Sequence, residues 1–178
     1  MFQRMLLVGM MLIVVTACST QMQGAAQQSK KGPSDAEITA LLASANEHYY
    51  YVLSGGNLAG KIEETAYNGT PYRYLGDDLS TLAKVQKYLE ETFTPETANQ
   101  ILTELKIVEI ASRAAQPNAD GGSLLDWNRA KLDVISANET SIIYHATVPL
   151  GDTGESVEEE VTIQHLDGAG WRVSMGVK

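Results

Sequence analysis

Residues 141–165, with the sequence SIIYHATVPLGDTGESVEEEVTIQH, decide the fold class. Apolar and polar side chains alternate from Ser141 to Leu150 and again from Ser156 to His165, and a period of two predicts β-strands. Gly151 to Glu155 between them is a turn. Further strands are predicted at Lys106 to Arg113, Arg129 to Ser136 and Trp171 to Val177, with turns at Asn138-Glu139 and Asp167 to Gly170. These strands predict a twisted antiparallel meander.

The residues before this meander show a helical period. Ser34 with Glu37 three residues later is a capping box, and the apolar spacing that follows ends at Gly55-Gly56. Further helices are predicted from Ser80 to Phe93 and from Thr94-Pro95-Glu96 onward, and Asn68-Gly69 predicts a hairpin between 62–67 and 71–75. We therefore expect an α+β fold, with N-terminal helices packed on a twisted antiparallel β-sheet meander, in one domain over residues 34–178.

The first residues carry the pattern of a bacterial lipoprotein. Arg4, an apolar run from Met5 to Val15 and small residues before Cys18 predict a signal peptide over residues 1–17. Two fatty acyl chains such as palmitate on Cys18 would hold the protein stably on a membrane. An ordinary signal peptide with an incidental cysteine is the alternative. Residues 18–33 predict a lipidated flexible linker. The expected location is extracytoplasmic, lipid-anchored to the outer face of the cell membrane.

The charge balance limits the class of partner. The chain has 13 basic and 22 acidic residues, a net charge of −9, and loss of the segment with Arg4 would leave −10. An acidic surface repels nucleic acid and anionic headgroups, so no nucleic-acid partner is expected. Cys18 is the single cysteine, so no disulfide supports the fold and stability must come from the core.

Residues typical of catalysis are sparse. His48, His145 and His165 show no metal-binding spacing, although the last two would form a weak site if they faced each other on neighbouring strands. No nucleophile elbow is present, and Glu158-Glu159-Glu160 is typical of an exposed strand. We therefore predict no catalytic residue, metal site or cofactor, and a protein that is not an enzyme.

One connection is longer than a hairpin needs. It runs from Ala115 to Trp127 and contains a proline, two adjacent glycines and polar residues that adopt unusual backbone angles. Leu124, Leu125 and Trp127 are expected to return it to the core. Long anchored loops in compact domains are often functional. A calcium loop is the alternative, but the terminal bidentate glutamate is missing.

Four segments resemble the IseA (YoeB) family of secreted DL-endopeptidase (autolysin) inhibitors. They are HYYYVLSGG at 48–56, YRYL at 72–75, AQPNADGGSLL at 115–125 and VPLGDTG at 148–154. With the shared order of elements, the resemblance extends over nearly all of the domain after Pro33. The 115–125 segment is the most specific of the four.

The resemblance implies a non-enzymatic, monomeric inhibitor of papain-like cysteine peptidases that cut peptidoglycan stems, and so a modulator of cell-wall autolysis. Its Gly-containing loop enters the active-site cleft of the DL-endopeptidase. In this sequence the inhibitory loop would comprise Pro117, Asn118, Ala119, Asp120, Gly121, Gly122 and Ser123. Asp120 would imitate a carboxylate of the peptide stem.

Two other classes remain open from the residues alone. A ligand-binding lipoprotein would need an apolar cavity lined by Tyr49, Tyr72, Tyr74 and Trp171, although such rings are more often core. A cell-wall adaptor without inhibitory action would use the same acidic surface.

Overall fold

A computed structural model describes residues 32–118 and 121–177, and residues 32–178 form one compact unit with its own core. The helices of the described residues are α1 (Asp35–Ser54), α2 (Leu82–Leu89) and α3 (Pro95–Glu104), with short 3₁₀ turns η1 (Asp77–Leu79) and η2 (Trp127–Arg129). The strands are β1 (Glu64–Tyr67), β2 (Thr70–Tyr74), β3 (Val108–Ile110), β4 (Arg113–Pro117), β5 (Lys131–Ala137), β6 (Ser141–Pro149), β7 (Ser156–Leu166) and β8 (Gly170–Met175). The predicted α+β class is confirmed.

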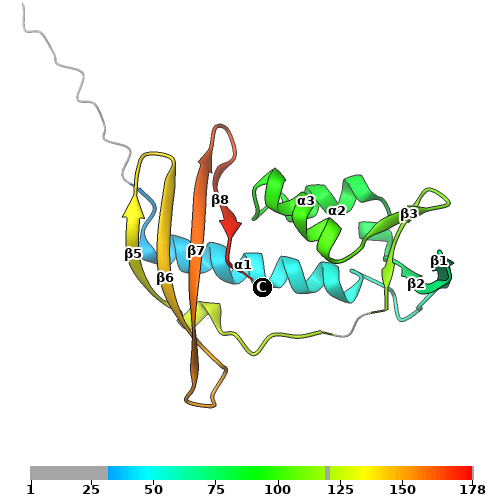
Figure 1. The fold of residues 1–178 in the computed structure, drawn as a ribbon, viewed down its shortest axis with the longest axis horizontal. Coiled ribbons are helices and arrows are strands. Elements are labelled where there is room, and N and C mark those ends of the chain that lie inside the picture. The colour runs from blue at the N-terminus through cyan, green and yellow to red at the C-terminus, as the bar shows by residue number, and fades with distance from the viewer. Residues whose placement is uncertain (1–31, 119–120, 178) are drawn as a thin grey trace, which may run out of the picture. The chain divides into compact units, whose positions relative to one another are not determined.

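Helix α1 begins and ends where its sequence predicts. The Ser34 amide donates to Glu37 Oε2 over 2.8 Å and the Ser34 hydroxyl accepts from the Glu37 amide, which completes the capping box. Gly55 ends the helix in the left-handed conformation, with φ of 95°. The helix extends from the β5–β8 sheet toward β2 (Figure 1), and its buried residues are Ile38, Leu42, Ala43, Ala45, Tyr49 and Val52.

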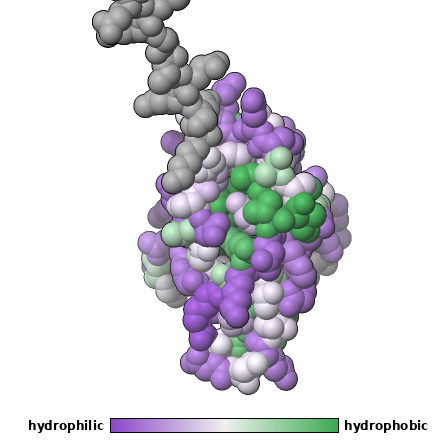
Figure 2. All heavy atoms as spheres, turned by 90° about the vertical axis from the view of Figure 1, so that its left-hand side faces the viewer, coloured by the Kyte–Doolittle hydropathy of each residue, from purple (hydrophilic) through white to green (hydrophobic). Residues whose placement is uncertain are grey.

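The second sheet is the predicted meander, in the order β5-β6-β7-β8. Tyr144 on β6 faces Val161 on β7, and alternate residues of both strands are buried against the helices. A bulge between Val134 and Ser136 leaves Val134 and Ile135 of the edge strand 57% and 56% exposed. Figure 2 shows an apolar area on this side of the protein. Most bounds shift by one or two residues, and Arg129 lies in η2 rather than in β5.

A separate first sheet, ordered β1-β2-β4-β3, is the main departure from the predicted single sheet. The hairpin at Asn68-Gly69 is confirmed. The predicted strand Lys106 to Arg113 is confirmed only over β3, because Ala111 and Ser112 have φ of 49° and 62° and turn the chain between β3 and β4. Neither residue type is typical of that conformation, so the pattern contained no turn signal.

Helix α2 ends at Leu89 and not at Phe93 as predicted. The Thr94 amide donates to the Val173 carbonyl over 2.9 Å, and the Val173 amide donates to the Thr92 carbonyl over 2.8 Å. Phe93 is 1% exposed between them. These tertiary hydrogen bonds hold Phe93 against Val173 of β8. If helix α2 continued to Phe93, this contact would be lost. No helix in the described part of the chain is long and apolar enough to span a membrane.

Candidate functional site

The connection between the two sheets starts after Pro117, the last residue of β4, and not at Ala115 as the sequence predicts. Ala115 and Gln116 are strand residues, and Pro117 ends β4 opposite Tyr72. A proline has no amide hydrogen to continue a ladder, so the strand stops there. Asn118, the next residue, is exposed.

The C-terminal end of α1 holds this starting point. Arg73 on β2 and Gln116 on β4 face each other in register, and both donate to the Leu53 carbonyl, over 2.9 Å and 2.7 Å. The two side chains are only 6% and 1% exposed. The last carbonyls of a helix have no partner within it and carry its negative end, so a guanidinium and an amide group stabilise them.

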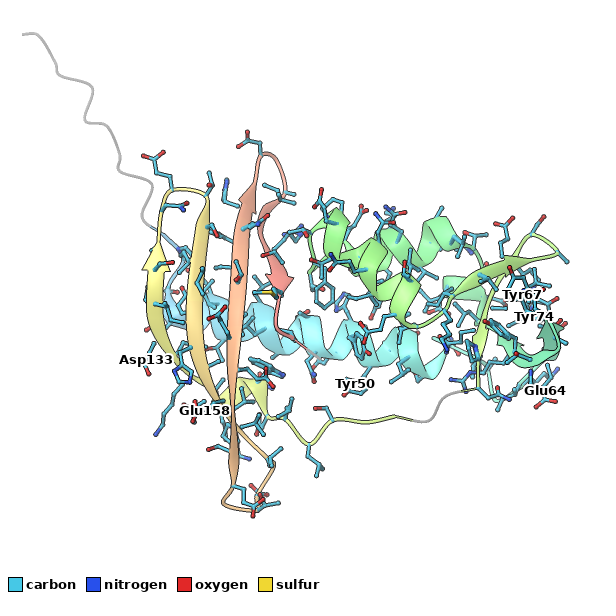
Figure 3. The ribbon with its side chains drawn as sticks, viewed as in Figure 1. Tyr50, Glu64, Tyr67, Tyr74, Asp133 and Glu158 are labelled. Carbon is cyan, nitrogen blue, oxygen red and sulfur yellow. The ribbon has the colours of Figure 1, made fainter. Side chains whose placement is uncertain are left out.

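Gly121, farther along the connection, also lies against Leu53. A Cβ added to Gly121 would lie 2.5 Å from Leu53 Cδ2 and 3.9 Å from the Tyr50 ring, so Gly121 packs against the tip of the Leu53 side chain, which would have to move to make room for a methyl group. Tyr50 lies on α1 between the two sheets (Figure 3). Gly122, in contrast, has nothing within 4 Å of the corresponding position.

The connection then attaches to the second sheet. The Ser123 hydroxyl accepts from the Leu125 amide over 3.0 Å. Leu125 pairs with Leu150, the Asp126 amide donates to the Pro149 carbonyl, and Trp127 is 2% exposed. The predicted return to the core is thus confirmed for Leu125 and Trp127. It is wrong for Leu124, which is 70% exposed because the chain turns inward one residue later.

The predicted site residues therefore divide into three groups. Pro117 and Ser123 are half-buried at the two ends, whereas Asn118, Gly121 and Gly122 are exposed between them. Ala119 and Asp120 lie outside the described residues, as does Cys18. Sequence reasoning missed Arg73 and the helix-end role of Gln116, since a Tyr-Arg-Tyr strand pattern alone would place the arginine toward solvent.

Tyr51, near the C-terminal end of α1, and Asp78 form a hydrogen-bonded pair of titratable side chains. The Tyr51 hydroxyl donates to Asp78 Oδ2 over 2.7 Å, and the Asn57 amide donates to Asp78 Oδ1. The hydrogen bond to Asp78 raises the pKa of Tyr51 to about 12. Partial burial raises the pKa of Asp78, but the hydrogen bonds from Tyr51 and Asn57 outweigh it and hold this pKa below 3.8.

The three histidines do not converge. His48 stacks on Tyr88 with 4.3 Å between ring centroids, and its Nδ1 lies 2.7 Å from the Ser44 carbonyl. His145 lies 2.7 Å from Glu158, whereas His165 contacts the Trp171 ring. His145 and His165 do not face each other, because the strand register pairs His145 with Glu160 and His165 with Trp171. Within residues 32–118 and 121–177, no group of three metal-ligating side chains is present.

The four rings of the ligand-binding alternative also lie in different surroundings. Tyr49 and Tyr72 are 8% and 5% exposed. Tyr74 borders an open hollow of about 400 Å³ and lies under the Arg113 guanidinium, which pairs with Glu63. Trp171 packs at the edge of the main core. Figure 3 shows Tyr67, Tyr74 and Glu64 together at the first sheet, far from Asp133 and Glu158 on the second.

Comparison with known proteins gives two matches. The family model described as "IseA DL-endopeptidase inhibitor" matches residues 29–175. The chain is also similar to "Uncharacterized protein YoeB" of Bacillus subtilis (strain 168). The two are 28% identical over 148 residues, which cover 79% of this chain and 80% of that protein.

Proposed function

Because the chain belongs to the IseA DL-endopeptidase inhibitor family, we propose that it blocks the cleft of a papain-like DL-endopeptidase with residues Pro117 to Ser123. The family implies a peptidase partner. In this proposal the protein is a monomer that performs no catalysis itself, and it modulates cell-wall autolysis by keeping peptide stems out of the enzyme.

The observation that carries the proposal is the attachment of this segment at both ends. Gln116 is fixed on Leu53, and Leu125 and Asp126 are fixed on the end of β6, while Asn118 and Gly122 between them face solvent. A segment whose ends are already held loses less conformational entropy when it binds. Gly122 has open space around it, so its backbone can approach a narrow cleft without a side chain in the way.

Charge supports the same partner. The chain carries a net charge of −9, and a complementary basic enzyme or wall-binding module would be attracted to it over a distance. Asp120 would supply the carboxylate that imitates the peptide stem. The lipid on Cys18 would keep the inhibitor at the outer face of the membrane, within reach of enzymes that act there.

The test uses the unit from Gly32 to Lys178, a purified DL-endopeptidase and cell walls, with loss of turbidity as the readout. Dose-dependent protection of the walls supports the proposal. Unimpeded lysis at a large excess of the protein, across several such enzymes, would exclude it and favour the adaptor reading.

The loop is tested separately with a bulky substitution. Gly122→Trp should leave the melting temperature unchanged, since nothing lies within 4 Å, but should weaken inhibition about tenfold or more by obstructing entry. Gly32→Trp is the matched control, because this glycine also has open space around it. Equal inhibition by Gly122→Trp and wild type would remove the loop from the mechanism.

Lipidation has its own test in cells. Labelled palmitate should enter the full-length protein and should be lost from Cys18→Ala, which should also leave the membrane fraction. Label that remains in the Cys18→Ala variant would contradict the anchor.

A further inference from the structure

The structure points to a positioning device at the base of the inhibitory segment. We propose that Leu53, Arg73 and Gln116, together with Gly121 of the segment itself, hold the segment in the geometry that binds; these four residues are here called the Leu53 dock. This inference rests on the proposed function, and apart from Gly121 it concerns residues behind the segment.

The carbonyl of Leu53 fixes the first end. It accepts hydrogen bonds from two strands at once, through Arg73 Nη2 at 2.9 Å and Gln116 Nε2 at 2.7 Å. Gln116 directly precedes Pro117, so the position of this side chain determines where the segment leaves β4. Gln116 is 1% exposed, and its Oε1 has no hydrogen-bond partner among the described residues. Leaving a buried acceptor unpaired is unfavourable, and the fold tolerates it here to place the amide group on Leu53.

The side chain of Leu53 fixes the second end. Gly121 lies so close that an added Cβ would be 2.5 Å from Leu53 Cδ2. The φ of Gly121 is outside the left-handed region, so an alanine at this position would meet the Leu53 side chain but would add no backbone strain. One helix residue thus sets both ends, the first through its carbonyl and the second through its isobutyl group.

Each side of the dock predicts a different consequence for a substitution. Gln116→Leu keeps the volume but removes the donor, so the first end is released. Gly121→Ala adds a methyl group that displaces either Leu53 or the segment. Gly122→Ala adds the same group in open space and serves as the control for the free protein.

Backbone ¹⁵N relaxation of the free protein tests the dock without any enzyme. The order parameters of the Gly121, Gly122 and Ser123 amides should fall below about 0.6, the range of flexible backbone, in Gln116→Leu and Gly121→Ala and should keep the wild-type values in Gly122→Ala. Unchanged order parameters in the first two variants would overturn the proposal. Because this readout involves no inhibition, it also distinguishes failure of the dock from failure of the proposed function.

Inhibition supplies the second readout. Gln116→Leu should raise Ki about tenfold, the order of effect expected when a binding segment is no longer held. Thr94→Val is the matched control for stability, since Thr94 is 1% exposed and caps α3 by accepting from Thr97 far from the segment. If Thr94→Val lowers the melting temperature as much and raises Ki as much, Gln116 acts only through stability and the proposal fails.

A double-mutant cycle tests the contact between Leu53 and Gly121 itself. Leu53→Ala removes the group that an alanine at 121 would meet but keeps the backbone carbonyl. Gly121→Ala should therefore raise Ki about tenfold in wild type and less than about twofold in Leu53→Ala, because neighbours in contact are not additive. The same increase in both backgrounds would contradict the dock.

Discussion

The two sheets of this domain are stabilised in different ways. The second sheet has long strands, with 9 residues in β6 and 11 in β7, and its buried side packs Tyr144, Val161 and Ile163 against the helices. The first sheet has strands of only 3 to 5 residues. Arg73 and Gln116 join it to the Leu53 carbonyl at the end of α1, and the amide of Gly76, just after β2, donates to the Gly55 carbonyl over 2.8 Å. Apolar burial is tolerant of small shifts, whereas hydrogen bonds and close backbone contacts require defined positions. The second sheet therefore supplies stability, and the first supplies geometry at the start of the Pro117–Ser123 segment.

The largest effect is expected in the second sheet. Ile163→Ala removes a side chain that is 0% exposed and leaves a cavity, so the free energy of unfolding should fall by about 2–5 kcal/mol. Urea denaturation measures this change. Inhibition per folded molecule should stay at the wild-type level. A raised Ki in protein that is shown to be folded would mean that the second sheet also affects the geometry of the segment.

A glycine that follows β2, the second strand of the first sheet, should give a smaller and more local effect. An added Cβ at Gly76 would lie 2.2 Å from the Asn57 carbonyl oxygen, a backbone atom that cannot rotate away. Gly76→Ala should destabilise by about 1–3 kcal/mol through this overpacking. Hydrogen exchange should rise in β2 and around Asn57 while β6 and β7 keep their protection. Equal loss of protection in both sheets would show that they do not differ in this way.

The start of α1 tests whether the helix that joins the sheets matters for stability. Ser34→Ala removes the cap that accepts from the Glu37 amide and should cost about 1 kcal/mol. Thermal unfolding measures the loss, and Ser136→Ala, which removes an exposed hydroxyl on β5, is the control. A stable Ser34→Ala protein with an unchanged melting temperature would contradict the role of the capping box.

The smallest effect concerns the Tyr51–Asp78 pair. The raised pKa of Tyr51, about 12, means that its contribution to stability is complete below pH 10.0 and is lost as the pH rises toward about 12. The lowered pKa of Asp78 means that its contribution is complete above 3.8 and is lost below it. Tyr51→Phe should destabilise by about 0.5 kcal/mol at neutral pH, since the pair is near the surface.

The pH dependence of the melting temperature checks this pair. The difference between wild type and Tyr51→Phe should be constant from about pH 5 to pH 9 and should shrink on both sides. A difference that stays constant through strongly acidic and alkaline buffers would mean that the hydrogen bond is not the cause.

Local signals explain why much of this fold could be predicted. The capping box of Ser34 and Glu37, the turn at Asn68-Gly69 and the alternation in β6 and β7 each depend on residues that are close in sequence. A short stretch of sequence is therefore enough to predict each of these features. The same holds for the approximate place of the connection between the two sheets, where proline and glycines interrupt the strand pattern.

The features that could not be predicted depend on distant contacts. The Ala111-Ser112 turn is imposed by pairing of β3 with β4, and α2 stops early because residues 92–94 bond to Val173. Arg73 looks like an exposed strand residue until α1 presents the Leu53 carbonyl to it. The close packing of Gly121 on Leu53 likewise depends on a residue far away in the sequence.

The mode of inhibition tests the central claim most directly. Initial rates of a DL-endopeptidase on a soluble stem peptide would be measured at several concentrations of the peptide and of the Gly32–Lys178 unit. Entry of the Pro117–Ser123 segment into the cleft predicts competitive inhibition, with a rising apparent KM and an unchanged maximal rate. A reduced maximal rate at an unchanged KM would place the inhibitor away from the cleft and contradict the account.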